Sequence, residues 1–257
     1  MTIMDDPIIQ RINTLNREFY QTFSHSFSST RALVQPGVKR MVRQFPKDGA
    51  ILDLGCGNGN LMKVLNDHGF QGLYAGVDFS ENLIHESQRM LRSFSEPPSY
   101  RAEFFVFDLA QSKWNTFPIH EDWDVICAFA VFHHIPGKMA RSQLFRNIHA
   151  LLKPRAEFIF SVWQPQNSRR MAKRFVSWDL VGIDADDVED GDVLLDWKAE
   201  QATTQNIGYR YVHIFQHEEL TELAEQTGFS INTSFYSDGK EGNIGLYQIW
   251  EKISENK

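Results

Sequence analysis

The sequence predicts an α/β fold with a doubly wound, mostly parallel sheet of seven strands, an antiparallel terminal hairpin and an insertion after strand five. Short apolar runs alternate with amphipathic segments between residues 50 and 163, and repeated strand-then-helix units form parallel sheets with helices on both faces. A glycine-rich turn follows the first of these runs. Ser237, Asp238 and Gly239 separate the last two strands as turn residues, so we expect these strands to pair antiparallel.

Each element is predicted from its residue spacing or from its flanking residues. Apolar residues at helical spacing predict a helix over residues 7–27, with a polar break at residues 28–30. Pro36 suits the first turn of a second helix, which runs to Phe45. Strands are expected over residues 50–54, 73–77, 104–107, 123–129, 157–163, 230–236 and 244–251, and further helices over residues 61–67, 82–94, 141–151 and 218–227.

We expect one domain over residues 1–257, with an N-terminal helical cap over residues 1–48 and an insertion or lid over residues 165–209. The insertion begins with a basic run and continues into an acidic one. The basic run fits a solvated helix face or an RNA contact, and the first interpretation is slightly favoured. Its residues are Arg169, Arg170, Lys173 and Arg174.

Composition limits the function classes. The net charge of −7 argues against nucleic-acid binding through the overall field, although a local basic patch is compatible with it. Cys56 and Cys127 are too few for a disulfide framework or a zinc cluster, and no metal site is expected. The chain shows neither a leader pattern nor a run of about 18 apolar residues, which favours the cytoplasm and no membrane contact.

The segment from Ile51 to Asn60 carries the strongest functional signal. Its glycines have the spacing G-x-G-x-G, and Asn60 stands where a dinucleotide site would have its third glycine. No Lys-Ser/Thr pair follows, which excludes a P-loop. Asp53 would oppose a pyrophosphate but suits the ammonium group of a methionine moiety, directly or through water or backbone. The alternative is a glycine-rich loop without a ligand.

Two further acids follow the next two strands. Asp78 ends the second strand, at the spacing expected for a carboxylate that binds ribose hydroxyls. Asp108 ends the third, where it could accept a hydrogen bond from an adenine amino group. Each acid alone could instead be a helix cap. Three acids at one sheet edge favour a bound adenosine.

Residues 50–163 resemble the class I S-adenosylmethionine-dependent methyltransferases, which have a Rossmann-like sheet of seven strands. The resemblance implies that Asp53, Gly55 and Gly57 line the methionine end of the cofactor. It also implies that Asp78 holds the ribose and Asp108 the adenine. The full set of expected cofactor contacts is Asp53, Gly55, Cys56, Gly57, Asn58, Asp78, Phe79, Asp108, Leu109 and Phe129.

Segments outside the glycine turn resemble the tRNA wobble-uridine methyltransferases, which esterify a carboxymethyl group on the anticodon uridine. They are residues 27–31, 130–134, 192–197 and 210–215. Two features depart from that family: Asp196 replaces its proline, and the surface is acidic. Related eukaryotic enzymes use a small zinc-binding partner. The apolar strand at residues 104–107 could recruit such an activator as a sheet edge, although burial under helices is the simpler interpretation.

The acceptor chemistry follows from ionisation. A carboxylate acceptor is already charged at neutral pH, so it needs an orienting cation rather than a base. Arg31 is the first candidate for that role, and His134, Arg210 and His213 are second candidates. The alternative for Arg31 is a surface arginine at a helix end.

A hydroxyl acceptor would instead need a base, which His133 or His134 could supply. Each histidine could alternatively pack or bond to backbone in the loop after strand four. Two other functions stay open, a small-molecule O- or N-methyltransferase and a non-catalytic scaffold that binds the cofactor.

Overall fold

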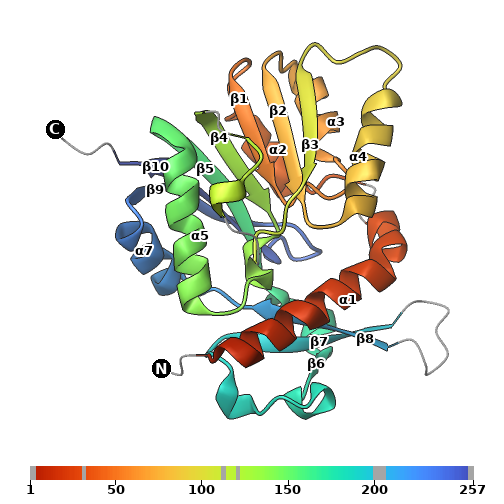
Figure 1. Ribbon diagram of the computed structural model, residues 1–257, viewed down its shortest axis with the longest axis vertical. Helices are drawn as coiled ribbons and strands as arrows, with labels where there is room; N and C mark the ends of the chain where they lie inside the picture. Colours follow the sequence, from red (N-terminus) through yellow and green to blue (C-terminus); the bar gives the residue numbers. More distant parts are fainter. Residues whose placement is uncertain (1–3, 31–32, 111–113, 120–121, 199–206, 254–257) are drawn as a thin grey trace.

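The computed structural model describes residues 4–30, 33–110, 114–119, 122–198 and 207–253. Seven of its strands form one sheet in the order β3-β2-β1-β4-β5-β10-β9, parallel from β3 to β5 and antiparallel from β5 to β9 (Figure 1). This arrangement confirms the predicted fold class. The strands are β1 (Ala50–Leu54), β2 (Leu73–Asp78), β3 (Arg101–Val106), β4 (Trp123–Phe129), β5 (Leu152–Trp163), β9 (Phe229–Ser237) and β10 (Gly245–Lys252).

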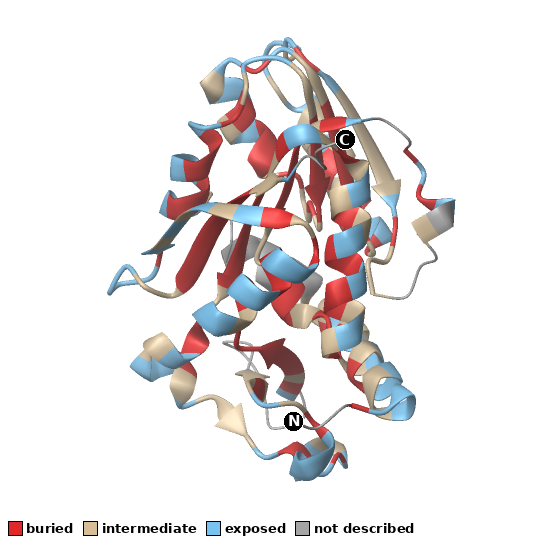
Figure 2. Cartoon of the chain, turned by 90° about the vertical axis from the view of Figure 1, so that its left-hand side faces the viewer, coloured by how far each residue is buried: buried red, intermediate tan, exposed pale blue. Residues whose placement is uncertain are grey.

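Helices cover both faces of this sheet. One apolar cluster joins it to α2 (Pro36–Val42) and α3 (Leu61–His68), with α4 (Glu81–Arg92) at its margin. The other cluster joins it to α5 (Lys138–Leu151) and α7 (His217–Gln226). Figure 2 shows the buried residues concentrated in the strands and on the helix sides that face them. None of the helices in the described ranges is long and apolar enough to cross a membrane.

A second, smaller sheet lies beside the long helix α1 (Asp6–Thr30) (Figure 1). It contains β6 (Phe175–Val176), β7 (Asp192–Lys198) and β8 (Ile207–His213), all antiparallel. Ile12 of α1 shares an apolar cluster with Leu194 and Tyr211 of this sheet. The helix therefore lies between the small sheet and the main one.

Several element boundaries differ from the prediction. The sequence did not predict β6 and β7 within residues 165–209, or β8 at the end of this segment. α1 continues through the expected polar break, and α5 begins at Lys138 rather than Arg141. β5 begins at Leu152, ahead of Pro154, because a register shift opposite Trp123 lets the strand include a residue that cannot donate a ladder hydrogen bond.

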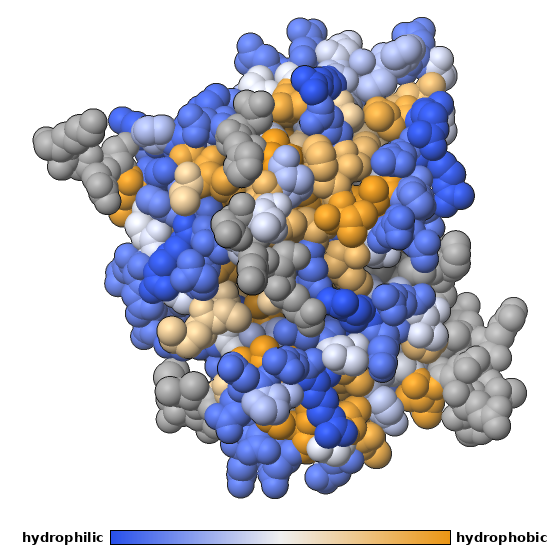
Figure 3. Space-filling model, in the orientation of Figure 1, coloured by the Kyte–Doolittle hydropathy of each residue, from blue (hydrophilic) through white to orange (hydrophobic). Residues whose placement is uncertain are grey.

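β3 is an edge strand of the main sheet, as predicted. Its side chains are partly exposed, and Val106 keeps 54% of its surface accessible. Figure 3 shows apolar atoms gathered on the upper half of this face, where Figure 1 places β3. Phe104 and Phe105 nevertheless pack against the core clusters on the two faces of the sheet, so the simpler interpretation, burial under helices, holds for them in part and not for Val106.

Candidate cofactor and acceptor site

The glycine turn folds over the end of the neighbouring strand. The backbone N–H groups of Gly55 and Cys56 donate to the carbonyl of Val77 at 2.8 and 2.9 Å. Gly55 and Gly57 have φ values of 71° and 57°, in the left-handed region that other residues rarely adopt. The backbone conformation of the glycines and these two hydrogen bonds thus fix the turn between the strand and the helix.

The two glycines differ in what surrounds them. A Cβ at Gly55 would meet the side chain of Val131 at 2.5 Å, so close packing alone requires glycine there. A Cβ at Gly57 would meet no atom within 4 Å, so this part of the turn faces open space. The turn can therefore be approached by a ligand at Gly57, which fits the methionine end of the expected cofactor.

Asp78 connects the turn to the second strand. Its carboxylate accepts hydrogen bonds from the backbone N–H groups of Gly57 at 3.0 Å and Ser80 at 2.9 Å. The N-cap of α4 is Ser80 rather than Asp78, so the helix-cap alternative does not account for this acid. Burial raises the pKa of Asp78 to about 6, against the lowering effect of these hydrogen bonds.

Asp53 lies beneath the turn and is 3% exposed. One carboxylate oxygen accepts from the Tyr74 hydroxyl at 2.7 Å, and the other lies 3.7 Å from the Cys127 thiol. Burial raises the pKa of Asp53 to about 7. Because Asp53 is buried beneath the turn, whereas Gly57 faces open space, the geometry favours an indirect effect of Asp53 on the methionine ammonium.

The other expected cofactor residues divide into inward and edge positions. Cys56 is buried, and its thiol packs toward Gly76, with its pKa raised by burial. Its side chain therefore faces the sheet, and only its backbone belongs to the turn. The remaining residues are partly exposed near the carboxyl edge: Asn58, Phe79, Leu109 and Phe129.

Asp108 forms an ion pair with Arg17 of α1. Its other oxygen accepts from the backbone N–H of Ala110 at 2.9 Å. The expected adenine carboxylate is thus already bonded to a residue that the sequence did not indicate. Arg17 and Tyr20 are three residues apart on one side of α1, and that spacing was the only available signal.

His134 lies in the 3-10 helix η2 (Phe132–His134), which follows β4. Its Nδ1 lies 3.1 Å from the Tyr211 carbonyl, and its Nε2 lies 2.6 Å from the Tyr20 hydroxyl. A carbonyl can only accept, so Nδ1 carries the proton and Nε2 accepts from Tyr20.

His133 has a different role from its neighbour. It is fully buried, and its Nδ1 accepts from the backbone N–H of Trp163 at 3.2 Å. The backbone-bonding alternative thus holds for His133, which is not the base of this site. Ala130, at the end of β4, has a φ of 59° and marks a strained backbone beside it.

Arg210 brings a cation to the same edge. It is 3% exposed on β8, and its guanidinium lies 4.7 Å from the Trp163 ring centroid and 5.1 Å from that of Phe19. Trp163 ends β5, next to the end of β4 that leads to His134. The residues brought together here come from α1, η2, β5 and β8. Arg31, the first candidate for orienting an acceptor, lies outside the described residues.

His213 does not join this group. It is three residues beyond Arg210 on the same strand, so its side chain points to the opposite face. Its ring nitrogens lie 2.6 Å from Asp192 and 2.9 Å from Glu219. Burial lowers its pKa, but the two carboxylates outweigh this and raise it. The expectation that His213 orients the acceptor is wrong, because both nitrogens are engaged in a buried charge network.

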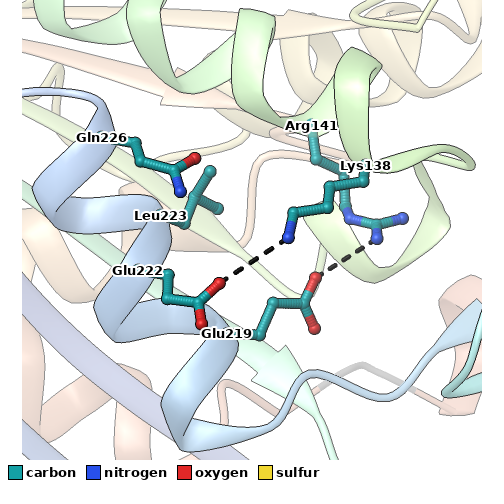
Figure 4. Close-up of a pocket in the computed structure, with 6 residues that line it drawn as sticks. All are labelled: Lys138, Arg141, Glu219, Glu222, Leu223 and Gln226. Atoms are coloured by element: carbon teal, nitrogen blue, oxygen red, sulfur yellow. Dashed lines mark hydrogen bonds and ion pairs between the residues drawn. The ribbon is translucent and has the colours of Figure 1, made fainter. Parts of the chain in front are cut away.

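That network borders a small pocket between α5 and α7. Figure 4 shows the two ion pairs across it, Lys138 with Glu222 at 3.7 Å and Arg141 with Glu219 at 3.2 Å. Arg141 also pairs with Glu189 at 2.7 Å. Glu189, Asp192 and His213 have ligand atoms within 4.8 Å of one another, but Arg141 already supplies the positive charge. We therefore interpret this cluster as structural.

Comparisons with known proteins agree with this geometry. The profile of the family described as "Methyltransferase domain" matches residues 27–234. The tRNA (carboxymethyluridine(34)-5-O)-methyltransferase of Schizosaccharomyces pombe is 25% identical over 241 residues, which cover 87% of this chain and 92% of that protein. The Arabidopsis thaliana protein of the same name is 28% identical over 148 residues, 56% of this chain and 31% of that protein.

Solved structures show the same fold. A methyltransferase from Methanosarcina mazei, described as SAM-dependent, superposes with a TM-score of 0.64 at 20% identity, covering 86% of this chain and 99% of that one. Magnesium protoporphyrin IX methyltransferase of Synechocystis with bound SAM gives 0.52 at 16% identity, covering 84% and 76%. The chain belongs to the methyltransferase-domain family. It is a class I methyltransferase whose methyl donor is S-adenosylmethionine.

Proposed function

We propose that this enzyme esterifies the carboxymethyl group of a modified uridine in tRNA. The observation that carries the proposal is Arg210, a buried cation between the rings of Trp163 and Phe19 at the carboxyl edge. A guanidinium in such surroundings can orient a carboxylate through paired hydrogen bonds. The names of the S. pombe and A. thaliana relatives support the same acceptor class.

The state of His134 also favours a carboxylate acceptor. Its Nε2 is engaged by the Tyr20 hydroxyl, and its Nδ1 by a backbone carbonyl. A hydroxyl acceptor would need a base with an available lone pair, whereas a carboxylate is ionised without help. The work left to the protein is alignment of the acceptor oxygen with the sulfonium methyl group.

The cofactor would be held by residues at the carboxyl ends of the first three strands. Gly57 offers an open backbone position for the methionine end, Asp78 would hold the ribose hydroxyls, and Asp108 would bind the adenine amino group. When bound, S-adenosylmethionine supplies an electrophilic methyl group on a sulfonium. The carboxylates of the chain complement the positive charge of that ligand.

The test uses labelled S-adenosylmethionine with three acceptors: tRNA that carries carboxymethyluridine, the same tRNA without the modification, and a pool of small metabolites. We expect label only in the first. A methyl ester is cleaved by mild alkali, so this label should be released as methanol. Label in the metabolites alone, or label stable to alkali, would rule out the esterification.

Two variants separate the role of Arg210 from general damage. We expect Arg210→Lys to lower kcat/KM for the modified tRNA about 100-fold, because an ammonium cannot form the paired, stacked contact. Lys153→Ala, at a half-exposed ion pair with Asp124, is the matched control and should change it less than about threefold. Calorimetry should show that both variants bind S-adenosylmethionine with the same affinity as the unmodified protein.

A small-molecule O-methyltransferase is the second candidate. The net charge of −7 favours it, and the ubiquinone biosynthesis O-methyltransferase of Coxiella burnetii is 27% identical over 111 residues, 43% of this chain. The metabolite arm of the labelling experiment decides between the two.

We also propose that β3 is the docking edge for a small activator protein. The partly exposed apolar strand supports it, because an unpaired sheet edge can accept a further strand. Val106→Lys should weaken that association without changing cofactor binding.

A further inference from the structure

Four cations lie within six residues after the fifth strand, and we name them the basic turn: Arg169, Arg170, Lys173 and Arg174. They occupy the short helix α6 (Arg169–Ala172) and the two residues that follow it. Arg169, Arg170 and Lys173 are exposed, and none of these three makes an ion pair within the described ranges. The basic turn is therefore locally positive on a chain whose net charge is −7.

The fold brings the basic turn next to the acceptor side of the site. It leaves the main sheet just after Trp163, on whose ring Arg210 stacks. It enters the small sheet at Phe175, which pairs with Leu195, and Leu195 pairs with Arg210. The segment that carries the basic turn thus begins beside Arg210, at the Trp163 ring, and ends two strand pairings from it, at Phe175.

An aromatic contact anchors the last cation of the turn. The guanidinium of Arg174 lies 5.6 Å from the Trp197 ring centroid, and Trp197 in turn meets Phe19 edge-on at 6.3 Å. Arg174 Nη1 also donates to the carbonyl of Asp196 at 3.5 Å. Arg174 is therefore fixed against the small sheet, while the other three cations are exposed.

The acidic residues of the same segment lie elsewhere. Trp178 and Ile183, which flank the first of them, share an apolar cluster with Met4 and with Ile12, in the first half of α1. Arg11, also in that half, donates to the carbonyl of Val181. The basic turn instead adjoins Phe19, in the later part of α1 that carries Tyr20. The segment therefore separates its charges, with the positive end toward the acceptor site.

We propose that the basic turn binds the phosphate backbone of RNA beside the nucleotide whose base enters the acceptor site. The inference rests on the proposed function and adds the surface that would hold the rest of the substrate. Exposed guanidinium groups without carboxylate partners are available for paired hydrogen bonds to phosphate. Three exposed cations so close in sequence fit a polyanion better than a single carboxylate group.

The experiment reverses three charges in Arg169→Glu/Arg170→Glu/Lys173→Glu. The control variant Arg89→Glu/Arg92→Glu/Arg146→Glu changes net charge equally, at exposed positions of α4 and α5. Fluorescence anisotropy with labelled tRNA measures binding directly, over a range of salt concentrations. We expect the first variant to bind at least tenfold more weakly, and its plot of log K against log salt to lose about two units of slope for three contacts. The control variant should retain most of the affinity and the slope.

The catalytic readout distinguishes the basic turn from the acceptor site. With modified tRNA, we expect the first variant to raise KM and leave kcat unchanged, while S-adenosylmethionine binding and the unfolding temperature stay the same. Equal tRNA affinity in the basic-turn variant and the unmodified protein would overturn the inference. If the unmodified protein binds tRNA through the basic turn but does not methylate it, the proposed acceptor is wrong and the RNA-binding role of the basic turn is retained.

Discussion

The donor half of the site is built from residues close in sequence, and the acceptor half from residues far apart. On the donor side, the turn at Gly55 and Gly57 bonds to Val77 and Asp78, about one strand-helix-strand unit away. On the acceptor side, Tyr20, His134, Trp163 and Arg210 come from four separate elements. A short sequence motif can therefore encode the first half but not the second.

The two halves also differ in charge, and the difference suits the proposed esterification. The donor half places buried carboxylates with raised pKa values, Asp53 and Asp78, under a turn that would face a cationic ligand. The acceptor half places a histidine with both ring nitrogens engaged beside a buried guanidinium, and the guanidinium suits an anion. An enzyme that joins a sulfonium methyl group to a carboxylate needs this separation, because each reactant must be held without neutralising the other.

The largest effect of a substitution is expected at Asp78, in the donor half. We expect Asp78→Asn to weaken S-adenosylmethionine binding about 100-fold at pH 8, because the amide accepts fewer and weaker hydrogen bonds than a carboxylate. The pKa of about 6 sets the pH window. If the carboxylate form of Asp78 binds the ribose, affinity is full above that pH and declines as the pH falls below it. Calorimetry from pH 8 to pH 5 should show a steeper decline in the unmodified protein than in the variant, in which only Asp53, with a pKa of about 7, still titrates.

A matched control is available at Asp124. It is a partly exposed acid that pairs with Lys153 at 2.8 Å and lies on β4. Asp124→Asn should leave cofactor affinity unchanged. A pH-independent affinity in the unmodified protein would contradict the assignment of Asp78.

The next effect in size is expected on the acceptor side, at Tyr20. Tyr20→Phe removes the hydroxyl that holds His134 Nε2 but keeps the ring contacts with Phe79 and Phe19. We expect kcat/KM for the acceptor to fall about tenfold, the size of one lost positioning hydrogen bond, with cofactor affinity unchanged. The measurement is steady-state kinetics with the acceptor varied, together with calorimetry for the cofactor.

The pH profile of the same variant distinguishes the two acceptor chemistries. With a carboxylate acceptor, no proton is removed, so kcat should stay flat between about pH 6.5 and 9 in both proteins. With a hydroxyl acceptor, Tyr20→Phe would release His134 as a base, and a new rise in kcat near the ordinary histidine pKa would appear. That rise would contradict the proposed esterification.

The parts of the molecule that the sequence predicted are those fixed by neighbours in the chain. The turn from Gly55 to Gly59 follows from backbone conformations that glycine adopts at little cost. The seven strands of the main sheet follow from apolar runs with turn residues between them. The glycine spacing argued against a dinucleotide and a P-loop but did not identify the ligand. The family resemblance identified the cofactor as S-adenosylmethionine.

The parts that the sequence missed depend on partners far along the chain. β6 is two residues long and exists because Phe175 and Val176 pair with β7, which no local pattern indicates. Arg17 had no signal of its own, since its partner Asp108 is 91 residues away. His213 was misplaced because the prediction did not use the alternation of side chains along a strand, which turns it away from Arg210.

The smallest effect of a substitution is expected at Arg17. This residue lies on α1, which contributes side chains to both halves of the site. Its ion pair with Asp108 is partly solvated, with 41% of the Arg17 side chain and 22% of the Asp108 side chain exposed. Partly solvated pairs of this kind contribute about 0.2 to 1 kcal/mol. If Asp108 binds the adenine amino group, the pair competes with the cofactor, and Arg17→Ala should tighten S-adenosylmethionine binding by about threefold. Adenosine should show the same gain and methionine none, whereas weaker binding of both would mean that Arg17 holds the cofactor itself.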